Sequence, residues 1–125
     1  MPRLILIVDD SPQVAANLEI ALCSTPEQTA LIASSGLEAL RILEAGHPAA
    51  AAVITDLDMP GIDGAQLVAR IRANPLLAHL PIIVSSGCTD PDAPARLLAL
   101  GANAFFTKPY SLSELKTKLE QLLHA

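Results

Sequence analysis

Short apolar runs recur along the chain at intervals that suit buried strands. They are rich in β-branched residues and are bounded by residues typical of turns. Runs of this length suit strands that are covered on both faces of a sheet. The five runs cover Leu4–Val8, Thr29–Ala33, Ala52–Thr55, Ile82–Ser85 and Ala104–Thr107.

Helical periodicity fills the intervals between these predicted strands. A first helix is expected from an N-cap at Ser11 to about Cys23, with Pro12 at its first position. A fourth is expected over Arg96–Leu100, because prolines at 91 and 94 confine or shorten it. The other helices have apolar faces made by Leu37, Leu40 and Leu43; by Leu67, Val68 and Ile71; and by Leu115, Leu119, Leu122 and Leu123.

Helix ends are also marked in the sequence. Asp63 is expected to be the N-cap of the helix that opens at Gly64. Ser111 and Glu114 have the spacing of a capping box at the start of the last helix. Gly46 marks the end of the second helix.

Strand and helix therefore alternate five times, which predicts an α/β fold. Parallel strands joined by right-handed crossovers give an open, doubly wound sheet with helices on both faces. In such sheets the ligand crevice lies at the carboxyl ends of the strands. Chemistry is therefore expected at that edge.

Polar residues interrupt the apolar pattern at the carboxyl ends of the predicted strands. They are Asp9 and Asp10 after the first, Asp56 and Asp58 after the third, Ser85 and Ser86 after the fourth, and Lys108 after the fifth. Each alone is weak evidence, because such residues are common in turns and caps. Their joint placement on one edge predicts a site.

Converging carboxylates repel one another, and a divalent cation that prefers oxygen ligands relieves this repulsion. A few carboxylates with open water positions suit Mg²⁺, or Mn²⁺ in its place. Lysine adds a point charge for a phosphoryl oxygen, and a serine hydroxyl adds a donor. Together these groups favour phosphoryl transfer to or from an aspartate.

Composition excludes several other classes of function. The net charge of −5 argues against direct nucleic-acid binding, which needs clustered Lys and Arg. The chain contains no apolar run long enough to cross a membrane. Cys23 and Cys88 have no metal-ligand spacing and are expected to be buried, reduced thiols of a cytoplasmic protein.

Four segments, in order and at matching spacing, resemble the receiver domains of two-component response regulators. They are Ile5–Ser11, Thr55–Gly64, Pro81–Gly87 and Gly101–Tyr110. The resemblance covers the whole chain and implies a flavodoxin-like sheet with strand order 2-1-3-4-5. It also implies one receiver domain over residues 1–125, with no output domain present.

The resemblance further implies roles for individual residues. Asp56 is implied to accept a phosphoryl group from a histidine kinase or a phosphotransfer protein, so the chain is a switch rather than a turnover enzyme. Its target is an unknown protein or output domain, bound through the face of the fourth helix, fifth strand and fifth helix. The implied metal ligands are Asp10, Asp56, the backbone carbonyl of Asp58 and, through water, Asp9. Lys108, whose bond to Pro109 is implied to be cis, is implied to contact the phosphoryl group. Ser86 and Phe105 are implied to act as switch residues, and Asp58 and Cys88 to tune the reaction.

Three positions depart from the commonest family pattern. Ser86 replaces a frequent threonine, so the hydroxyl remains but a methyl group is lost. Phe105 lacks the hydroxyl of the tyrosine that is frequent there, so any response of this residue to activation must rest on a change in its burial. Asp58 adds a carboxylate where the family varies.

Two other functions are open to the same residues. Asp56-Leu57-Asp58 resembles the motif of aspartyl-phosphate hydrolases, although theirs follows the first strand and their chains carry a substrate cap. A receiver-like protein that binds partners without phosphorylation is the second alternative. The intact acidic pair, Ser86 and Lys108 count against it.

Overall fold

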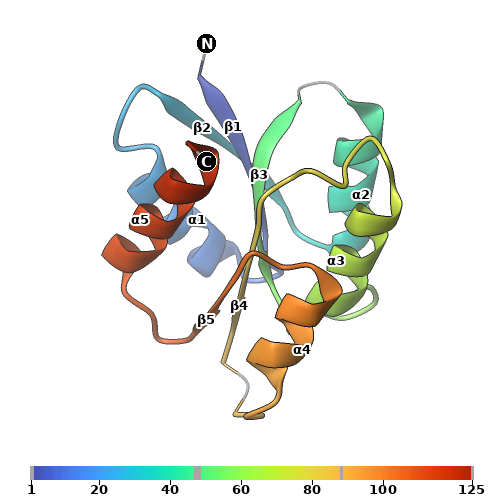
Figure 1. Cartoon of the computed structure of the whole chain (residues 1–125). Helices are drawn as coiled ribbons and strands as arrows, with labels where there is room; N and C mark the ends of the chain where they lie inside the picture. Colours follow the sequence, from blue (N-terminus) through green and yellow to red (C-terminus); the bar gives the residue numbers. More distant parts are fainter. Residues whose placement is uncertain (1, 47–48, 88, 125) are drawn as a thin grey trace.

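Strands and helices alternate along the whole of the described chain (Figure 1). The computed structural model describes residues 2–46, 49–87 and 89–124. The strands are β1 (Arg3–Val8), β2 (Gln28–Ala33), β3 (Ala50–Asp56), β4 (Ile82–Ser86) and β5 (Ala104–Thr107). The helices are α1 (Pro12–Leu22), α2 (Gly36–Ala45), α3 (Gly64–Ala73), α4 (Ala93–Leu100) and α5 (Leu112–Leu123). The predicted α/β alternation is confirmed.

The strands form one parallel sheet in the order β2-β1-β3-β4-β5, as the resemblance implied. Its register brings the carboxyl ends of neighbouring strands together. Val8 lies opposite Thr55, and Asp56 lies opposite Ser85. The residues after β1, β3 and β4 therefore share one edge of the sheet.

Helices cover both faces of the sheet because the strands are apolar on both faces (Figure 1). Alternate residues of β1 show the division: Ile5 and Ile7 pack with α1 and α5, whereas Leu6 and Val8 pack with α2, α3 and α4. All four side chains are buried. This core fixes the positions of the strand ends on which the polar residues stand.

The predicted fourth helix begins earlier than expected. α4 starts at Ala93, so Pro94 lies in its first turn and does not confine the helix. Proline is tolerated there because the N–H groups of the first turn have no partner within the helix. The N-cap residue Asp92 makes no side-chain capping bond to the described chain.

The capping bonds differ in part from the prediction. Ser111 accepts a hydrogen bond from the Glu114 N–H, as expected. The capping box predicted there is wrong, because no reciprocal bond from the Glu114 side chain to Ser111 occurs in the described part of the chain. A complete capping box stands instead at α3, between the predicted N-cap Asp63 and Gln66.

Cys23 is half-buried just after α1, so the predicted burial of this thiol is wrong in degree. Cys88 lies outside the described residues. Within residues 2–46, 49–87 and 89–124, no helix has the length and apolar character to cross a membrane.

Gly64 allows α3 to begin directly against the end of β3. Its N–H donates to the Leu57 carbonyl at 2.9 Å. A Cβ atom at this position would lie 2.5 Å from the Asp56 carbonyl oxygen and 2.7 Å from the Leu57 Cα atom. Both are backbone atoms, which cannot move aside without shifting the strand end that carries Asp56.

We therefore expect Gly64→Ala to lower the free energy of unfolding by about 1–3 kcal/mol, the cost typical of overpacking. Gly87→Ala is the matched control, because a Cβ there meets no atom of the described chain within 4 Å. Urea unfolding of the two variants measures the difference. Equal stabilities for both would show that α3 is not held this closely.

Candidate functional site

Three carboxylates meet at the carboxyl edge of the sheet. Asp9 and Asp10 follow β1, and Asp56 ends β3, the central strand. One carboxylate oxygen from each lies within 4.8 Å of the others. Asp9 and Asp56 are buried, whereas Asp10 is exposed. The strand ends thus hold a cluster of negative charge at the boundary of the core.

Lys108 brings positive charge to this cluster from the loop after β5. Its Nζ lies 3.3 Å from Asp56 Oδ1 and 3.7 Å from Asp9 Oδ2. Its backbone N–H donates to the Ser86 carbonyl at 2.8 Å, which ties the loop to the end of β4. The Lys108–Pro109 peptide bond is cis, as expected.

A second pair of polar side chains lies beside the cluster. Ser86 Oγ donates a hydrogen bond to Asp58 Oδ2 at 2.5 Å. Ser86 is fully buried at the end of β4, while Asp58 is exposed in the loop after β3. The Asp58 carboxylate therefore bonds to the neighbouring strand end and is not one of the three clustered carboxylates.

Burial and neighbouring charge shift the pKa values of the central pair. Burial raises the pKa of Asp56 above its ordinary value, and although Lys108 opposes this, Asp9 adds to it. Burial alone would lower the pKa of Lys108, but the charges of Asp56 and Asp9 outweigh burial and raise it. The lysine therefore stays protonated at neutral pH, and ionisation of Asp56 remains costly.

The cluster fits a divalent cation. Three carboxylates face one lysine, so negative charge is in excess. Asp56 Oδ1 is buried and has no hydrogen-bond partner within the described chain, and Lys108 Nζ forms an ion pair with it at 3.3 Å. Hard oxygen ligands of this kind suit Mg²⁺ and Mn²⁺. Asp9, Asp10 and Asp56 are the residues that could hold the ion.

Comparison with known proteins identifies a family in which the cluster of carboxylates and lysine can be interpreted. The family model described as "Response regulator receiver domain" matches residues 5–120. This chain belongs to the response regulator receiver domain family.

Its relatives are proteins of very different length. The chain is 31% identical over 98% of its length to the sensor histidine kinase TmoS of Ectopseudomonas mendocina, but it spans only 12% of that protein. It is also 31% identical to the chemotaxis protein CheY-3 of Vibrio cholerae, over 94% of this chain and 89% of the relative. A solved structure of a response regulator receiver protein from Pseudomonas putida matches with a TM-score of 0.86 and 32% identity, over 97% of this chain and 98% of that one.

The receiver domain brings together most of the residues that the sequence placed at its edge. Asp9, Asp10, Asp56 and Lys108 form one cluster. Ser86 lies next to this cluster, because the Lys108 N–H donates a hydrogen bond to the Ser86 carbonyl. Ligation of a metal by the Asp58 carbonyl and switching by Ser86 stay predictions.

Phe105 and Cys88 complete the set of predicted residues. Phe105 is half-buried on β5 and packs against the core on the side of α2, α3 and α4. Its inward turn on activation stays a prediction. Cys88, predicted to tune the reaction, lies outside the described residues.

The hydrogen bond between Ser86 and Asp58 was missed in the sequence. The available signal was indirect: both residues follow strands that are neighbours in the implied strand order. Spacing along the chain does not show which way an exposed carboxylate turns. Only the structure reveals that Asp58 points to β4.

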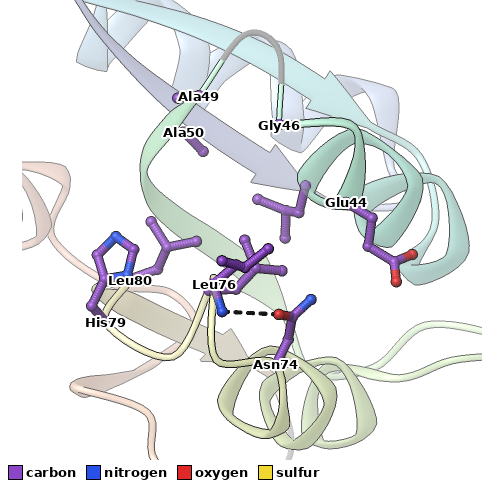
Figure 2. A pocket seen from close by; sticks show the side chains of 10 residues that line it. Glu44, Gly46, Ala49, Ala50, Asn74, Leu76, His79 and Leu80 are labelled. Atoms are coloured by element: carbon purple, nitrogen blue, oxygen red, sulfur yellow. Dashed lines mark hydrogen bonds between the residues drawn. The ribbon is translucent and has the colours of Figure 1, made fainter.

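A separate cavity lies at the opposite edge of the sheet (Figure 2). It has a volume of about 460 Å³ and lies where β3 begins at Ala50 and where Leu80 precedes β4. Asn74 Oδ1 accepts the Leu76 N–H on its wall at 3.0 Å. None of the three clustered aspartates lines it, so this cavity is separate from the polar site.

Asp10 offers a test of the charge cluster because it is exposed. Asp10→Asn removes repulsion from Asp9 and Asp56, so the metal-free protein should gain up to about 1 kcal/mol of stability. The same change should reduce the stabilisation that Mg²⁺ or Mn²⁺ gives, because a ligand is lost. Thermal unfolding in chelator and in a series of cation concentrations measures both effects.

Glu27→Gln is the matched control. It removes an exposed negative charge that lies just before β2, at the amino ends of the strands and therefore away from the cluster. It should leave the cation effect unchanged. If Asp10→Asn instead keeps the full stabilisation by cations, these carboxylates are not the binding site.

Proposed function

We propose that this receiver domain is a phosphoacceptor switch that takes a phosphoryl group onto Asp56. The donor is a histidine kinase or a phosphotransfer protein, and the change is passed to a target protein or output domain. The observation that carries the proposal is the buried Asp56 carboxylate, 3.3 Å from Lys108 and within 4.8 Å of two further carboxylates.

The surroundings of the three carboxylates favour Asp56 as the acceptor. Asp9 Oδ1 accepts the Ser11 N–H at 2.9 Å, and its other oxygen lies near Lys108. Asp10 belongs to the same cluster but is exposed. Asp56 has a buried oxygen without a hydrogen bond in the described chain, next to a lysine that can hold a transferred group. It is the best-placed nucleophile.

In the proposed step, an Asp56 carboxylate oxygen forms a bond to phosphorus as the phosphorus–nitrogen bond of the donor phosphohistidine breaks. The electron pair of that bond stays on the imidazole nitrogen, and the ring leaves as neutral imidazole because its other nitrogen already carries a proton. Lys108 pairs with an oxygen of the transferred group, and the Ser86 hydroxyl donates to another. Such positioned charges act mainly by stabilising charge in the transition state.

Asp9, Asp10, Asp56 and the Asp58 carbonyl would hold Mg²⁺ or Mn²⁺. When bound, the ion supplies positive charge to the oxygens of the phosphoryl group. Asp9 and Asp10 would hold the ion beside Asp56, and without the ion their negative charges disfavour the ionised form of Asp56. The reaction should therefore depend on divalent cation.

The face made by α4, β5 and α5 is proposed to bind the target. α4 follows the loop after Ser86, and Phe105 lies on β5. Exposed leucines stand on both helices, at Leu98 and Leu100 of α4 and Leu112 of α5. Since the domain makes up different fractions of its relatives, the partner is a separate protein or a further part of a longer chain.

The proposal is tested with acetyl phosphate as a small-molecule donor. Incubation with Mg²⁺ should add a phosphoryl group that intact-mass measurement detects, and Asp56→Asn should abolish the adduct. Asp58→Asn should retain it, because Asp58 lies outside the carboxylate cluster.

The same experiment separates the alternative functions. A hydrolase would consume acetyl phosphate over many turnovers without a lasting adduct, and a phosphorylation-independent binding protein would do neither. An undiminished adduct in Asp56→Asn would exclude Asp56 as the acceptor.

Hydrogen exchange tests the proposed target face. α4 begins without a side-chain cap in the described chain, so we expect its first turn to rearrange more readily than the capped helices. Binding of beryllofluoride, a mimic of the phosphoryl group, should change exchange in residues 89–100 and leave α2 unaffected. If beryllofluoride binds but hydrogen exchange in residues 89–100 does not change, α4 takes no part in the proposed mechanism.

A further inference from the structure

The hydrogen bond between Ser86 and Asp58 competes with the proposed chemistry. Ser86 Oγ donates to Asp58 Oδ2 at 2.5 Å, a distance typical of hydroxyl–carboxylate bonds. A serine hydroxyl carries a single proton, so it donates one hydrogen bond at a time. While that proton is bonded to Asp58, it cannot serve a phosphoryl oxygen on Asp56.

We propose that Asp58 is a positioning residue that holds the Ser86 hydroxyl away from the acceptor site, so that phosphorylation must exchange one partner for the other. The proposal rests on the proposed function, in which Ser86 donates to the transferred group. In the unphosphorylated protein the donor is engaged by Asp58. In the phosphorylated protein its proton turns to the phosphoryl oxygen, and the Asp58 carboxylate is released.

Hydrogen bonds hold the backbone around this pair in place, so the Ser86 hydroxyl changes its partner by side-chain motion. The Ser86 carbonyl accepts the Lys108 N–H at 2.8 Å, and the Ser85 carbonyl accepts the Leu57 N–H at 2.8 Å. These bonds fix the end of β4 to both flanking loops. Rotation of the Ser86 side chain moves its proton without breaking either of them.

Asp58 has room to leave once the bond is broken. It lines a surface hollow of about 470 Å³ with Met59, Asp63 and Arg96. The released carboxylate can therefore be solvated there, in a hollow that Arg96 of α4 also lines. The cost of the exchange is thus mainly the lost hydrogen bond.

The bond should favour the unphosphorylated state by a measurable factor. The loss of one hydrogen bond to a charged group typically changes an equilibrium constant by about tenfold or more. Loss of the Asp58 carboxylate should thus tighten beryllofluoride binding by about tenfold. Asp58→Asn keeps a neutral acceptor, so its effect should lie between those of wild type and Asp58→Ala.

Removal of the charge of Asp58 would also reduce repulsion of the anion, and a double-mutant cycle separates the two effects. Beryllofluoride dissociation constants are measured by calorimetry at saturating Mg²⁺ for wild type, Asp58→Ala, Ser86→Ala and the double variant. Charge repulsion acts in both backgrounds, whereas the hydrogen bond acts only when Ser86 is present. We expect Asp58→Ala to tighten binding about tenfold more with Ser86 than in the Ser86→Ala background.

An equal effect of Asp58→Ala in both backgrounds would overturn the proposal and leave charge as the whole cause. Urea unfolding midpoints of the four proteins identify any variant that is not folded. If wild type neither binds beryllofluoride nor forms an acetyl phosphate adduct, the proposed function itself fails. That outcome is distinct from an uncoupled cycle in a protein that does bind.

Discussion

Crowding of negative charge at the end of the sheet is the constraint on which the rest of the site depends. Three carboxylates lie within 4.8 Å of one another, and one lysine, 3.3 Å from Asp56, offsets part of their charge. Burial raises the pKa of Asp56 and the charge of Asp9 raises it further, so the metal-free arrangement is unfavourable. A divalent cation held by these carboxylates would offset the excess negative charge.

The fold makes this arrangement possible by ending the strands of a parallel sheet at one edge. Apolar packing on both faces holds β1 and β3 in register, which brings Asp9 and Asp10 to Asp56. α3 begins at Gly64 directly against the backbone of Asp56 and Leu57, which confines the end of β3. Stability supplied by the core thus offsets the unfavourable electrostatics of the site.

Much of this architecture could be predicted from the sequence, because its signals are local. Apolar runs and helical periodicity gave five strands and five helices, and the polar residues that follow the strands marked the site. The start of α4 was predicted too late, because proline is excluded from helix interiors but allowed in a first turn. Strand order and residue roles came from family resemblance, since periodicity does not order strands.

Side-chain partners across the fold could not be predicted in this way. The bond from Ser86 to Asp58 depends on rotamers at two strand ends, which residue types alone do not fix. The same holds for Arg72, whose guanidinium bonds to the Gly101 carbonyl and to Asn103 Oδ1 far along the chain. Arg72 is partly buried without a carboxylate partner among these contacts, an arrangement that sequence patterns seldom suggest.

Of the clustered carboxylates, we propose that Asp56 alone takes the phosphoryl group. Reduction of the phosphorylated protein with borohydride converts an acyl phosphate to a stable alcohol, which peptide mass spectrometry can assign to one residue. We expect the modification at Asp56 and at no other aspartate. A modification at Asp9, Asp10 or Asp58, or none in protein that carries the phosphoryl adduct, would contradict it.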